Sequence, residues 1–352
     1  MNIIVLAGGY SAERDVSLVS GSQAAMALQG RGHAVLLLDP YRSIERHDSF
    51  QGLFEAYRQD SFGYAISKTE PDLAALKQAI GNGEDLLGEN VLQACKLADV
   101  VFIGLHGSYG ENGQVQAAFD LFDICYTGSG YIGCMLSMDK AVAKELMAAH
   151  GVQVPRSEEL FIGDMSPAEF REALAHRKLP VVVKPCNGGS SIGVTIVKTE
   201  ADIDKAIAYA QVQEDRVLAE DYIAGREFSV GVLDGHALPV IEICPKSGFF
   251  DYANKYQANA TNEICPASIP EDLAGKMQAA ALQAHRALRL GDYSRVDFIA
   301  DHQGEIYCLE ANSLPGMAPA SLLPKEALAA GIPYEDLCER IVQLAVNRKK
   351  GF

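Results

Sequence analysis

The residues best suited to chemistry in this sequence are two carboxylates and an amide on two apolar strands near the C-terminus. Asp297 lies in SRVDFIA, and Glu310 and Asn312 lie in CLEANSLPG. Residues two apart in a strand point to the same face, so Glu310 and Asn312 project together, and an adjacent antiparallel strand can bring Asp297 to them. These oxygen donors suit Mg²⁺, which also takes phosphate oxygens. Arg295 shares the face of Asp297, where it can stabilise developing negative charge. A solvated strand face is disfavoured because a buried carboxylate pair needs a cation.

Two lysines and a glycine-serine loop form the second candidate group. Lys184 ends the apolar run PVVVK and is followed at once by the loop in CNGGSSIG, and Lys140 lies earlier, in SMDKAVAKELM. A lysine at the end of a strand can simply reach the surface, but glycines let a backbone approach phosphate oxygens and offer amide donors. Ser190 and Ser191 add hydroxyl donors. The lysine of a Walker loop follows the loop and opens a helix, so this segment indicates a different kind of phosphate site.

A pair of glutamates and an acidic loop complete the candidates. Glu220 and Glu227 flank YIAGR after the strand VLAE, either as surface residues or as acceptors for a ribose hydroxyl or an adenine amine. Near the N-terminus, LAGGYSAERDVSLVSG has the strand, glycine turn and helix of a nucleotide-binding unit. It lacks the third glycine of the dinucleotide fingerprint, and Glu13 and Asp15 would repel a phosphate. The pattern alone leaves the ligand of this loop open.

The elements that must position these residues follow an α/β order in roughly the first 125 residues. Apolar runs predict strands at 3–7, 34–39 and 99–107, with a helix at 16–29. This layering indicates an open parallel sheet, in which ligands bind beyond the carboxyl ends of the strands. Because GGYSAE and HGSYGENG both follow strands, we expect them to face one crevice.

Later segments predict strands that pair as hairpins, with helices between them. The glycine-serine loop should join two strands of one hairpin. The expected helices are 137–150 and 274–290, the expected strands are 180–185, 194–198, 216–223 and 227–233, and a long polar segment covers 246–263. Residues 41–98 carry no motif.

Composition excludes several classes of protein. The chain has 352 residues, 22% of them charged, and a formal net charge of −16, which argues against a non-specific nucleic-acid binder. No run of eighteen apolar residues is present, so no membrane span is expected, and MNIIVLAGG is typical of a first strand rather than a signal peptide. The eight cysteines form no CxxC pair, which favours reduced thiols over a zinc site.

Taken in chain order, the motifs resemble a known enzyme family. They are GGYSAERDVSLVSG, HGSYGENG, SMDK, VVVKPCNGGSSIGV, AEDYIAGREF, FFDYANKY, SRVDF and LEANSLPGM. This order resembles the D-alanine–D-alanine ligase family of the ATP-grasp superfamily over nearly the whole chain. The resemblance implies an α/β fold, α+β in its ATP-grasp part. An open parallel-sheet N-terminal domain (1–128) is then followed by two ATP-grasp domains (129–223 and 224–352) whose antiparallel sheets sandwich ATP.

The resemblance also implies a role for each matching residue. The residues that match ATP-binding positions are Lys140, Lys184, Ser190, Ser191, Glu220, Glu227 and Lys255. Those that match the ligands of two Mg²⁺ ions, with Mn²⁺ as a substitute, are Asp297, Glu310 and Asn312. Those that match positions contacting the two D-alanine substrates are Glu13, His106, Arg295 and Ser321. Those that match catalytic positions are Glu13, Ser190, Tyr256, Arg295 and Gly316.

The resemblance answers the question that the first loop raises. Glu13 matches the carboxylate that binds the ammonium of the first D-alanine, and Ser190 and Tyr256 match its hydrogen-bonding partners. Arg295 and the backbone of Gly316 match the pair that stabilises the oxyanion. The implied reaction joins two D-alanines through an acyl phosphate, for peptidoglycan synthesis in a bacterial cytoplasm, with no nucleic-acid or membrane partner. A homodimer is suggested by analogy alone.

Other functions stay open at this point. The acceptor could be D-serine or D-lactate, although Tyr256 disfavours lactate, and the run APAS at 318–321 replaces a more hydroxyl-rich segment of the family. An inactive nucleotide-binding scaffold should have lost a lysine or a metal ligand, and none is lost. A Rossmann dehydrogenase needs GxGxxG, which GGYSAE does not supply.

Overall fold

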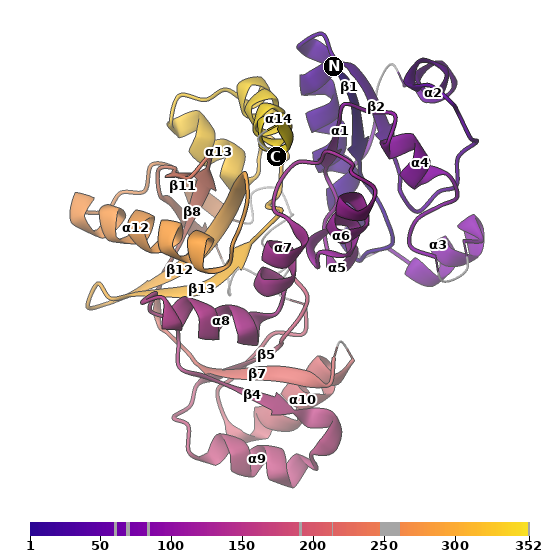
Figure 1. Cartoon of the computed structure of the whole chain (residues 1–352). Helices are drawn as coiled ribbons and strands as arrows, with labels where there is room; N and C mark the ends of the chain where they lie inside the picture. Colours follow the sequence, from indigo (N-terminus) through magenta and orange to yellow (C-terminus); the bar gives the residue numbers. More distant parts are fainter. Residues whose placement is uncertain are drawn as a thin grey trace.

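A computed structural model describes residues 1–59, 62–67, 71–82, 85–189, 192–212, 214–246 and 261–350. It contains three separate sheets. Figure 1 shows them as three bodies, with the first at the upper right, the second at the bottom and the third at the left. The chain passes through them in that order and then returns to the first.

The N-terminal body is a parallel sheet in the order β2-β1-β3, as the sequence predicts. Its strands are β1 (Asn2–Leu6), β2 (Ala34–Leu38) and β3 (Val100–Ile103). Its helices are α1 (Arg14–Gly30), α2 (Phe50–Tyr57), α3 (Leu73–Ile80), α4 (Val91–Cys95), α5 (Ser108–Glu111), α6 (Gln114–Leu121) and α7 (Tyr131–Met138). The described parts of the segment 41–98, which carries no motif, contain three of these helices, so the segment elaborates this body.

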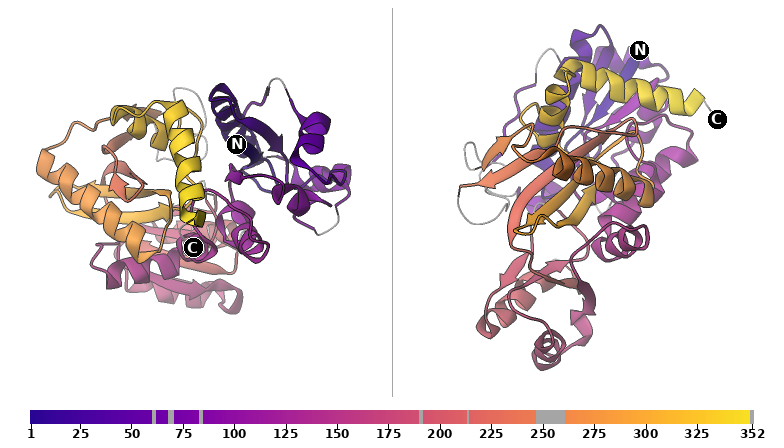
Figure 2. Two further views of the ribbon diagram at one scale, coloured as in Figure 1. Left: turned by 45° about the horizontal axis from the view of Figure 1, so that its top comes forward. Right: turned by 90° about the vertical axis from the view of Figure 1, so that its left-hand side faces the viewer.

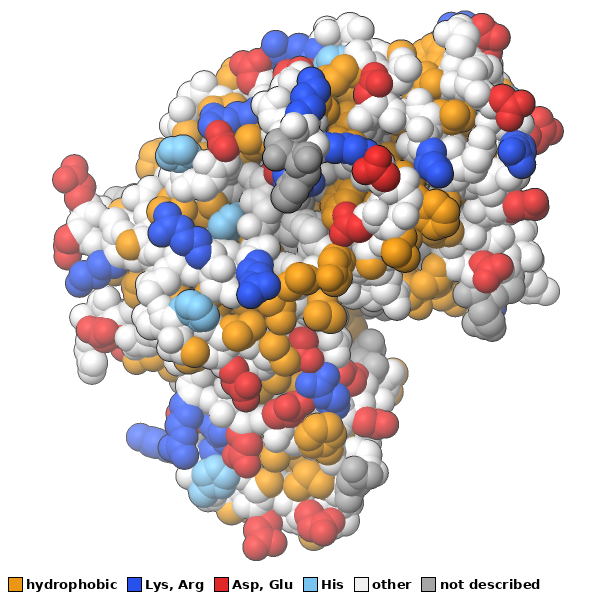
Figure 3. Space-filling view, in the orientation of Figure 1, with side chains coloured by type: hydrophobic (Ala, Val, Ile, Leu, Met, Phe, Trp, Pro, Cys, Tyr) orange, Lys and Arg blue, Asp and Glu red, His pale blue; other side chains and the backbone are white. Residues whose placement is uncertain are grey.

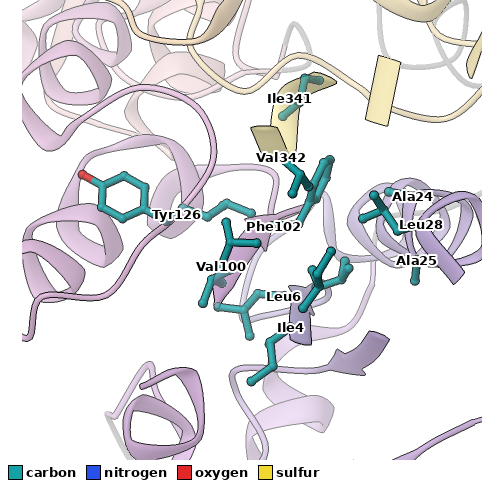
Figure 4. Close-up of a cluster of buried hydrophobic side chains, with 14 of the residues drawn as sticks. Ile4, Leu6, Ala24, Ala25, Leu28, Val100, Phe102, Tyr126, Ile341 and Val342 are labelled. Atoms are coloured by element: carbon teal, nitrogen blue, oxygen red, sulfur yellow. The ribbon is translucent and has the colours of Figure 1, made fainter. Parts of the chain in front are cut away.

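The core of this body includes a helix from the other end of the chain. Helix α14 (Tyr334–Lys350) packs against α1 and β3, and Figure 4 shows Ile341 and Val342 of α14 close to Phe102. Figure 2 shows the yellow C-terminal helix alongside the indigo N-terminal segment. Burial of these apolar faces stabilises the contact, so division of the chain into three successive segments does not describe the packing of α14.

The central body is an antiparallel sheet in the order β4-β7-β5-β6. Its strands are β4 (Ser157–Phe161), β5 (Val181–Pro185), β6 (Thr195–Val197) and β7 (Arg216–Asp221), and its helices are α8 (Lys140–Ala149), α9 (Pro167–Ala175) and α10 (Ile203–Gln211), with 3₁₀ turns at Ile162–Asp164 and Glu200–Asp202. Strands β5 and β6 pair directly, which confirms the hairpin predicted around the glycine-serine loop. Figure 1 shows α9 and α10 on the outer face of this sheet.

The third body is a larger antiparallel sheet, with strand order β11-β10-β8-β12-β13 and β9 paired to β8. Its strands are β8 (Gly225–Leu233), β9 (His236–Ala237), β10 (Ile241–Pro245), β11 (Thr261–Ile264), β12 (Tyr293–Asp301) and β13 (Ile306–Asn312), and its helices are α12 (Glu271–Ala287) and α13 (Leu322–Ala329). Strands β12 and β13 are antiparallel neighbours, as expected.

One helix prediction needs correction, and the correction matters for the site. The single helix predicted at 137–150 is two helices, because Asp139 adopts an extended conformation and caps α8. Its carboxylate accepts hydrogen bonds from the amides of Ala141 and Val142, both at 3.1 Å. Lys140 therefore begins α8, which Figure 1 shows between the central and third sheets. No helix within the described ranges is both long enough and apolar enough to cross a membrane.

Candidate active site

A cavity of about 390 Å³ lies between the two antiparallel sheets. The central sheet contributes Val182, Lys184 and Ile196 to its lining, together with Glu220 at the end of β7. The third sheet contributes residues of β8, β10, β12 and β13, including Glu227, Ile243, Asp297, Ile299 and Glu310. Apolar side chains thus face each other across the cavity, with cationic and anionic groups at its edges. This is the arrangement that a base and a polyphosphate require.

Lysines and a buried carboxylate form the cationic edge of this cavity. Lys184 is only 7% exposed, so it does not extend to the surface. Its Nζ donates to Glu220 Oε1 at 2.6 Å, and Lys144 Nζ lies 3.0 Å from Glu220 Oε2. Burial opposes ionisation of Glu220, but the two lysines together hold its pKa below the ordinary value. Lys140 Nζ donates to the carbonyl of Gly188 at 2.5 Å.

The glycine loop between β5 and β6 reaches the N-terminal body. Gly188 has φ +99°, a left-handed conformation that favours glycine. A Cβ atom at Gly189 would lie 3.4 Å from Glu13 Oε2. The loop therefore connects the cationic edge of the cavity to the acidic loop after β1, two segments that are far apart in the sequence.

The acidic residues predicted on β12 and β13 do come together. Asp297 pairs with Glu310 across the two strands, and Arg295 pairs with Asn312. The guanidinium of Arg295 binds both oxygens of Asp297, with Nε to Oδ1 at 2.9 Å and Nη2 to Oδ2 at 2.8 Å. Asn312 Nδ2 donates to Asp297 Oδ2 at 3.2 Å. Thus all four side chains predicted to share this face are neighbours.

An irregularity in the ladder affects the direction of Glu310. Between Asp297 and Phe298 the register shifts, because Asp297 pairs with Glu310 while Phe298 pairs with Cys308. Leu309 is the extra residue, and both Leu309 and Glu310 line the cavity between the sheets. Bulges near active sites re-aim a side chain in this way.

A second, smaller cavity of about 210 Å³ adjoins the first. Glu310 and Gly189 border both cavities. The smaller one joins the N-terminal loops to the third body, and its lining includes Glu13, His106, Glu111, Arg295, Asn312, Gly316 and Ser321. Ser321 Oγ would lie 3.0 Å from a Cβ atom at Gly316, so this hydroxyl and the glycine backbone are close neighbours. Every predicted substrate contact lies at this cavity.

Buried polar contacts fix the two N-terminal loops at the carboxyl edge of the parallel sheet. Ser17 Oγ accepts from the amide of Gly8 at 2.8 Å and donates to the carbonyl of Gly104 at 2.7 Å, which joins the two loops. Arg14 Nη2 pairs with Asp39 at 2.5 Å. Residues of both GGYSAE and HGSYGENG, namely Glu13, His106 and Glu111, line the smaller cavity, so the predicted common crevice is confirmed. Strong polar anchors are needed here because the site requires the loops to hold one geometry.

His106 lies at the back of this crevice and is 6% exposed. Its Nε2 is 3.1 Å from Ser20 Oγ, and its Nδ1 is 3.4 Å from Glu111 Oε1. Burial raises the pKa of Glu111, although the hydrogen bond from His106 opposes the rise. Glu13, at 9% exposure, lines the same cavity as Glu111. The two N-terminal loops thus each bring one carboxyl group to this cavity.

Four predicted site residues, Ser190, Ser191, Lys255 and Tyr256, lie outside the described residues. Two residues that sequence reasoning missed belong to the site. Lys144 follows Lys140 by four positions, a spacing that puts both on one helix face, and Glu111 lies inside HGSYGENG. The four-residue spacing from Lys140 could have indicated Lys144. Glu111 could have been found as the charged residue inside the motif HGSYGENG.

Two family models match almost the whole chain. The description "D-ala D-ala ligase N-terminus" matches residues 2–129, and "D-ala D-ala ligase C-terminus" matches residues 146–343. The chain is 43% identical over 348 residues to the D-alanine–D-alanine ligase of Pediococcus pentosaceus, which covers 97% of each chain. It is 38% identical over 346 residues to that of Lacticaseibacillus casei, covering 97% of this chain and 95% of the relative.

Solved structures of ligases have a similar fold over nearly the whole chain. A D-alanine–D-alanine ligase from Bacillus anthracis complexed with ATP matches with a TM-score of 0.75 and 28% identity, covering 100% of this chain and 98% of that chain. The VanG D-Ala:D-Ser ligase from Enterococcus faecalis matches with a TM-score of 0.74 and 27% identity, covering 97% and 98%.

Two antiparallel sheets enclose a cavity lined by lysines and carboxylates, and together with the matches to solved ligases, one of them complexed with ATP, they place the chain among the ATP-dependent ligases of the ATP-grasp class. The full-length similarities narrow that class. The chain belongs to the D-alanine–D-alanine ligase family. Its activity is the ATP-dependent ligation of D-alanine to D-alanine, which serves peptidoglycan synthesis.

Proposed function

We propose that ATP occupies the cavity between the sheets and that two D-alanine molecules occupy the smaller cavity beside it. The observation that carries this proposal is that Glu310 and Gly189 border both cavities. A nucleotide with its base between the apolar strands would bring its terminal phosphate to that border. Lys140 and Lys184 would then bind phosphate oxygens, and Glu220 and Glu227 would contact the adenosine. The hydroxyls of Ser190 and Ser191, and Lys255, would complete the phosphate site.

The acidic group at the border fits magnesium. Asp297, Glu310 and Asn312 offer oxygen donors on adjacent strands, which is the donor chemistry that Mg²⁺ prefers. We propose that these three residues would hold two Mg²⁺ ions, with Mn²⁺ as a substitute. When bound, the metal neutralises charge on the phosphates.

In this proposal Glu13 binds the ammonium of the first D-alanine, beside His106. A carboxylate oxygen of that substrate attacks the γ-phosphorus, ADP leaves, and an acyl phosphate forms. Ser190 and Tyr256, which match hydrogen-bonding partners of Glu13 in the family, would help to exclude water from this intermediate. The first substrate is thereby held between the N-terminal body and the glycine loop.

The second D-alanine lies near Ser321, whose hydroxyl binds its carboxylate. The neutral amine of this substrate attacks the acyl carbon, and the C–O bond to phosphate breaks. The tetrahedral oxyanion lies against Arg295 and the amide of Gly316, two donors suited to developing negative charge. The products are D-Ala-D-Ala, ADP and phosphate.

D-Serine is the second candidate acceptor, because a D-Ala:D-Ser ligase is among the similar structures and because Ala318 and Ala320 line the smaller cavity near Ser321. A competition assay with D-alanine, D-serine and D-lactate as acceptors, with mass spectrometry of the products, distinguishes the candidates. We expect mainly D-Ala-D-Ala at neutral pH. A majority of mixed dipeptide or ester would show that the acceptor assignment is wrong, while the ATP site could stand.

The quaternary state and the compartment belong to the proposal as well. Four apolar residues are exposed here: Leu121 at the end of α6, which is 85% exposed, Phe122 directly after it, and Tyr131 and Met135 on α7. Figure 3 shows hydrophobic side chains gathered over the region of α7. Such a patch suits a homodimer, which sedimentation of wild type and Leu121→Asp would test. All eight cysteines are free, which together with the use of ATP suits the cytoplasm.

A further inference from the structure

Lys144 is a buried lysine that the proposed chemistry does not use. It lies on α8, one turn after Lys140, and its side chain is 2% exposed. Lys140 lines the cavity between the sheets, whereas Lys144 is not among the described residues that line it. Burial lowers the pKa of Lys144, and the carboxylate of Glu220 opposes that change. A lysine in such a position needs a partner, and Glu220 is that partner.

Glu220 is shared between two lysines. Oε1 accepts from Lys184 at 2.6 Å, and Oε2 lies 3.0 Å from Lys144 Nζ. Glu220 is 3% exposed and borders the cavity, so Lys184 approaches it from the cavity edge and Lys144 from α8. One carboxylate thus has two separate counter-ions, and the trio carries one net positive charge.

This arrangement becomes important when a nucleotide binds. Lys184 has a single ammonium, so a phosphate that binds it competes with Glu220 for the same group. If Lys184 were the only counter-ion, phosphate binding would leave a buried carboxylate unpaired, which is strongly unfavourable. Lys144 removes that penalty because it neutralises Glu220 from the side away from the nucleotide.

We propose that Lys144 is a positioning residue that keeps Glu220 charge-balanced while Lys184 turns to the phosphates of the nucleotide. The inference rests on the proposed placement of ATP between the sheets. It also gives Glu220 a second role, because Oε1 becomes available to a donor on the bound adenosine once Lys184 leaves it. Lys144 acts through Glu220 and touches no substrate.

A purely structural role for Lys144 predicts something different. The lysine lies on the same helix as Met147, whose Sδ is 3.5 Å from Cys308 Sγ on β13, so loss of its packing could loosen α8. Looser packing would weaken the binding of every ligand of the cavity by a similar factor. The proposed role affects only ligands that carry phosphates, and it vanishes when Glu220 is neutral.

The test compares ADP with adenosine on folded variants of the full chain. We expect Lys144→Met to weaken ADP binding about tenfold or more, with adenosine affinity within about threefold of wild type. Calorimetry measures the affinity for ADP, and displacement of a fluorescent nucleotide measures the affinity for adenosine. The matched control is Lys205→Met, an exposed lysine on α10, which should change neither affinity. In Lys144→Met/Glu220→Gln, ADP affinity should return to that of Glu220→Gln alone.

An equal loss for ADP and adenosine, or a loss that Glu220→Gln does not recover, would overturn the proposal in favour of a structural role. If Lys144→Met does not fold, Lys144→Arg takes its place. An ADP-to-adenosine affinity ratio close to wild type then supports the charge role, and a tenfold drop contradicts it. Lys184→Met separates the two proposals: if it leaves ADP affinity unchanged, the nucleotide placement itself fails.

Discussion

Replacement of Arg295 by lysine tests the oxyanion assignment most sharply. Arg295 binds both oxygens of Asp297, at 2.9 and 2.8 Å, and also borders the smaller cavity. Lysine keeps the charge but has one ammonium, so it cannot hold Asp297 in two bonds and also face an oxyanion. We expect kcat to fall about 10²–10³-fold, the usual effect of removing one oxyanion donor (roughly 2.7–4 kcal/mol).

Other contacts should let this variant fold. Asp297 keeps its hydrogen bonds from Ser229 Oγ at 2.8 Å and Asn312 at 3.2 Å. The assay is steady-state phosphate release with D-alanine and ATP, together with thermal unfolding. The matched control is Arg171→Lys in the exposed pair with Asp204. A kcat within about threefold of wild type in folded Arg295→Lys would refute the assignment.

Three further outcomes are expected. Glu310→Gln should lower kcat at least about 10²-fold, and excess EDTA should abolish turnover until Mg²⁺ is restored; turnover that survives either treatment contradicts the metal assignment. Gly21→Ala should destabilise the fold by about 1–3 kcal/mol in urea, because its Cβ would lie 2.4 Å from Ala7 Cβ, whereas Gly30→Ala on the same helix has open space and should not destabilise it. Burial lowers the pKa of His285 to about 4, so the unfolded chain takes up the proton first as pH falls. The free energy of unfolding should therefore drop by about 1–2 kcal/mol between pH 7.5 and 5, and His285→Gln should reduce that drop. Urea unfolding across this pH range measures it, and the same pH dependence in wild type and His285→Gln would contradict the prediction.

Much of the fold follows from local sequence patterns. The apolar runs of β1, β2 and β3 predict a parallel sheet, and the carboxyl ends of its strands do bring the two polar loops together. The period-two spacing of Glu310 and Asn312, and the position of Asp297 on a neighbouring strand, predict the acidic face. These features depend on residues close in the chain or on one strand pairing.

Other features depend on contacts that no local pattern shows. The return of α14 to the N-terminal sheet needs Ile341 and Val342 to meet Phe102, more than two hundred positions away. The break at Asp139 is a capping choice that competes with a continuous apolar helix. The extra residue Leu309 in β13 and the pairing of Lys144 with Glu220 likewise appear only when strands and helices are packed in three dimensions.

The central claim is that the carboxylate of the first D-alanine attacks ATP at the border between the two cavities. The direct test supplies D-alanine with ¹⁸O in both carboxylate oxygens, together with ATP and Mg²⁺, and measures the released phosphate by mass spectrometry. The attacking oxygen stays on phosphorus when the C–O bond breaks, so each phosphate should carry one ¹⁸O, and each phosphate should be matched by one D-Ala-D-Ala. Phosphate without ¹⁸O, with dipeptide still formed, would contradict the account.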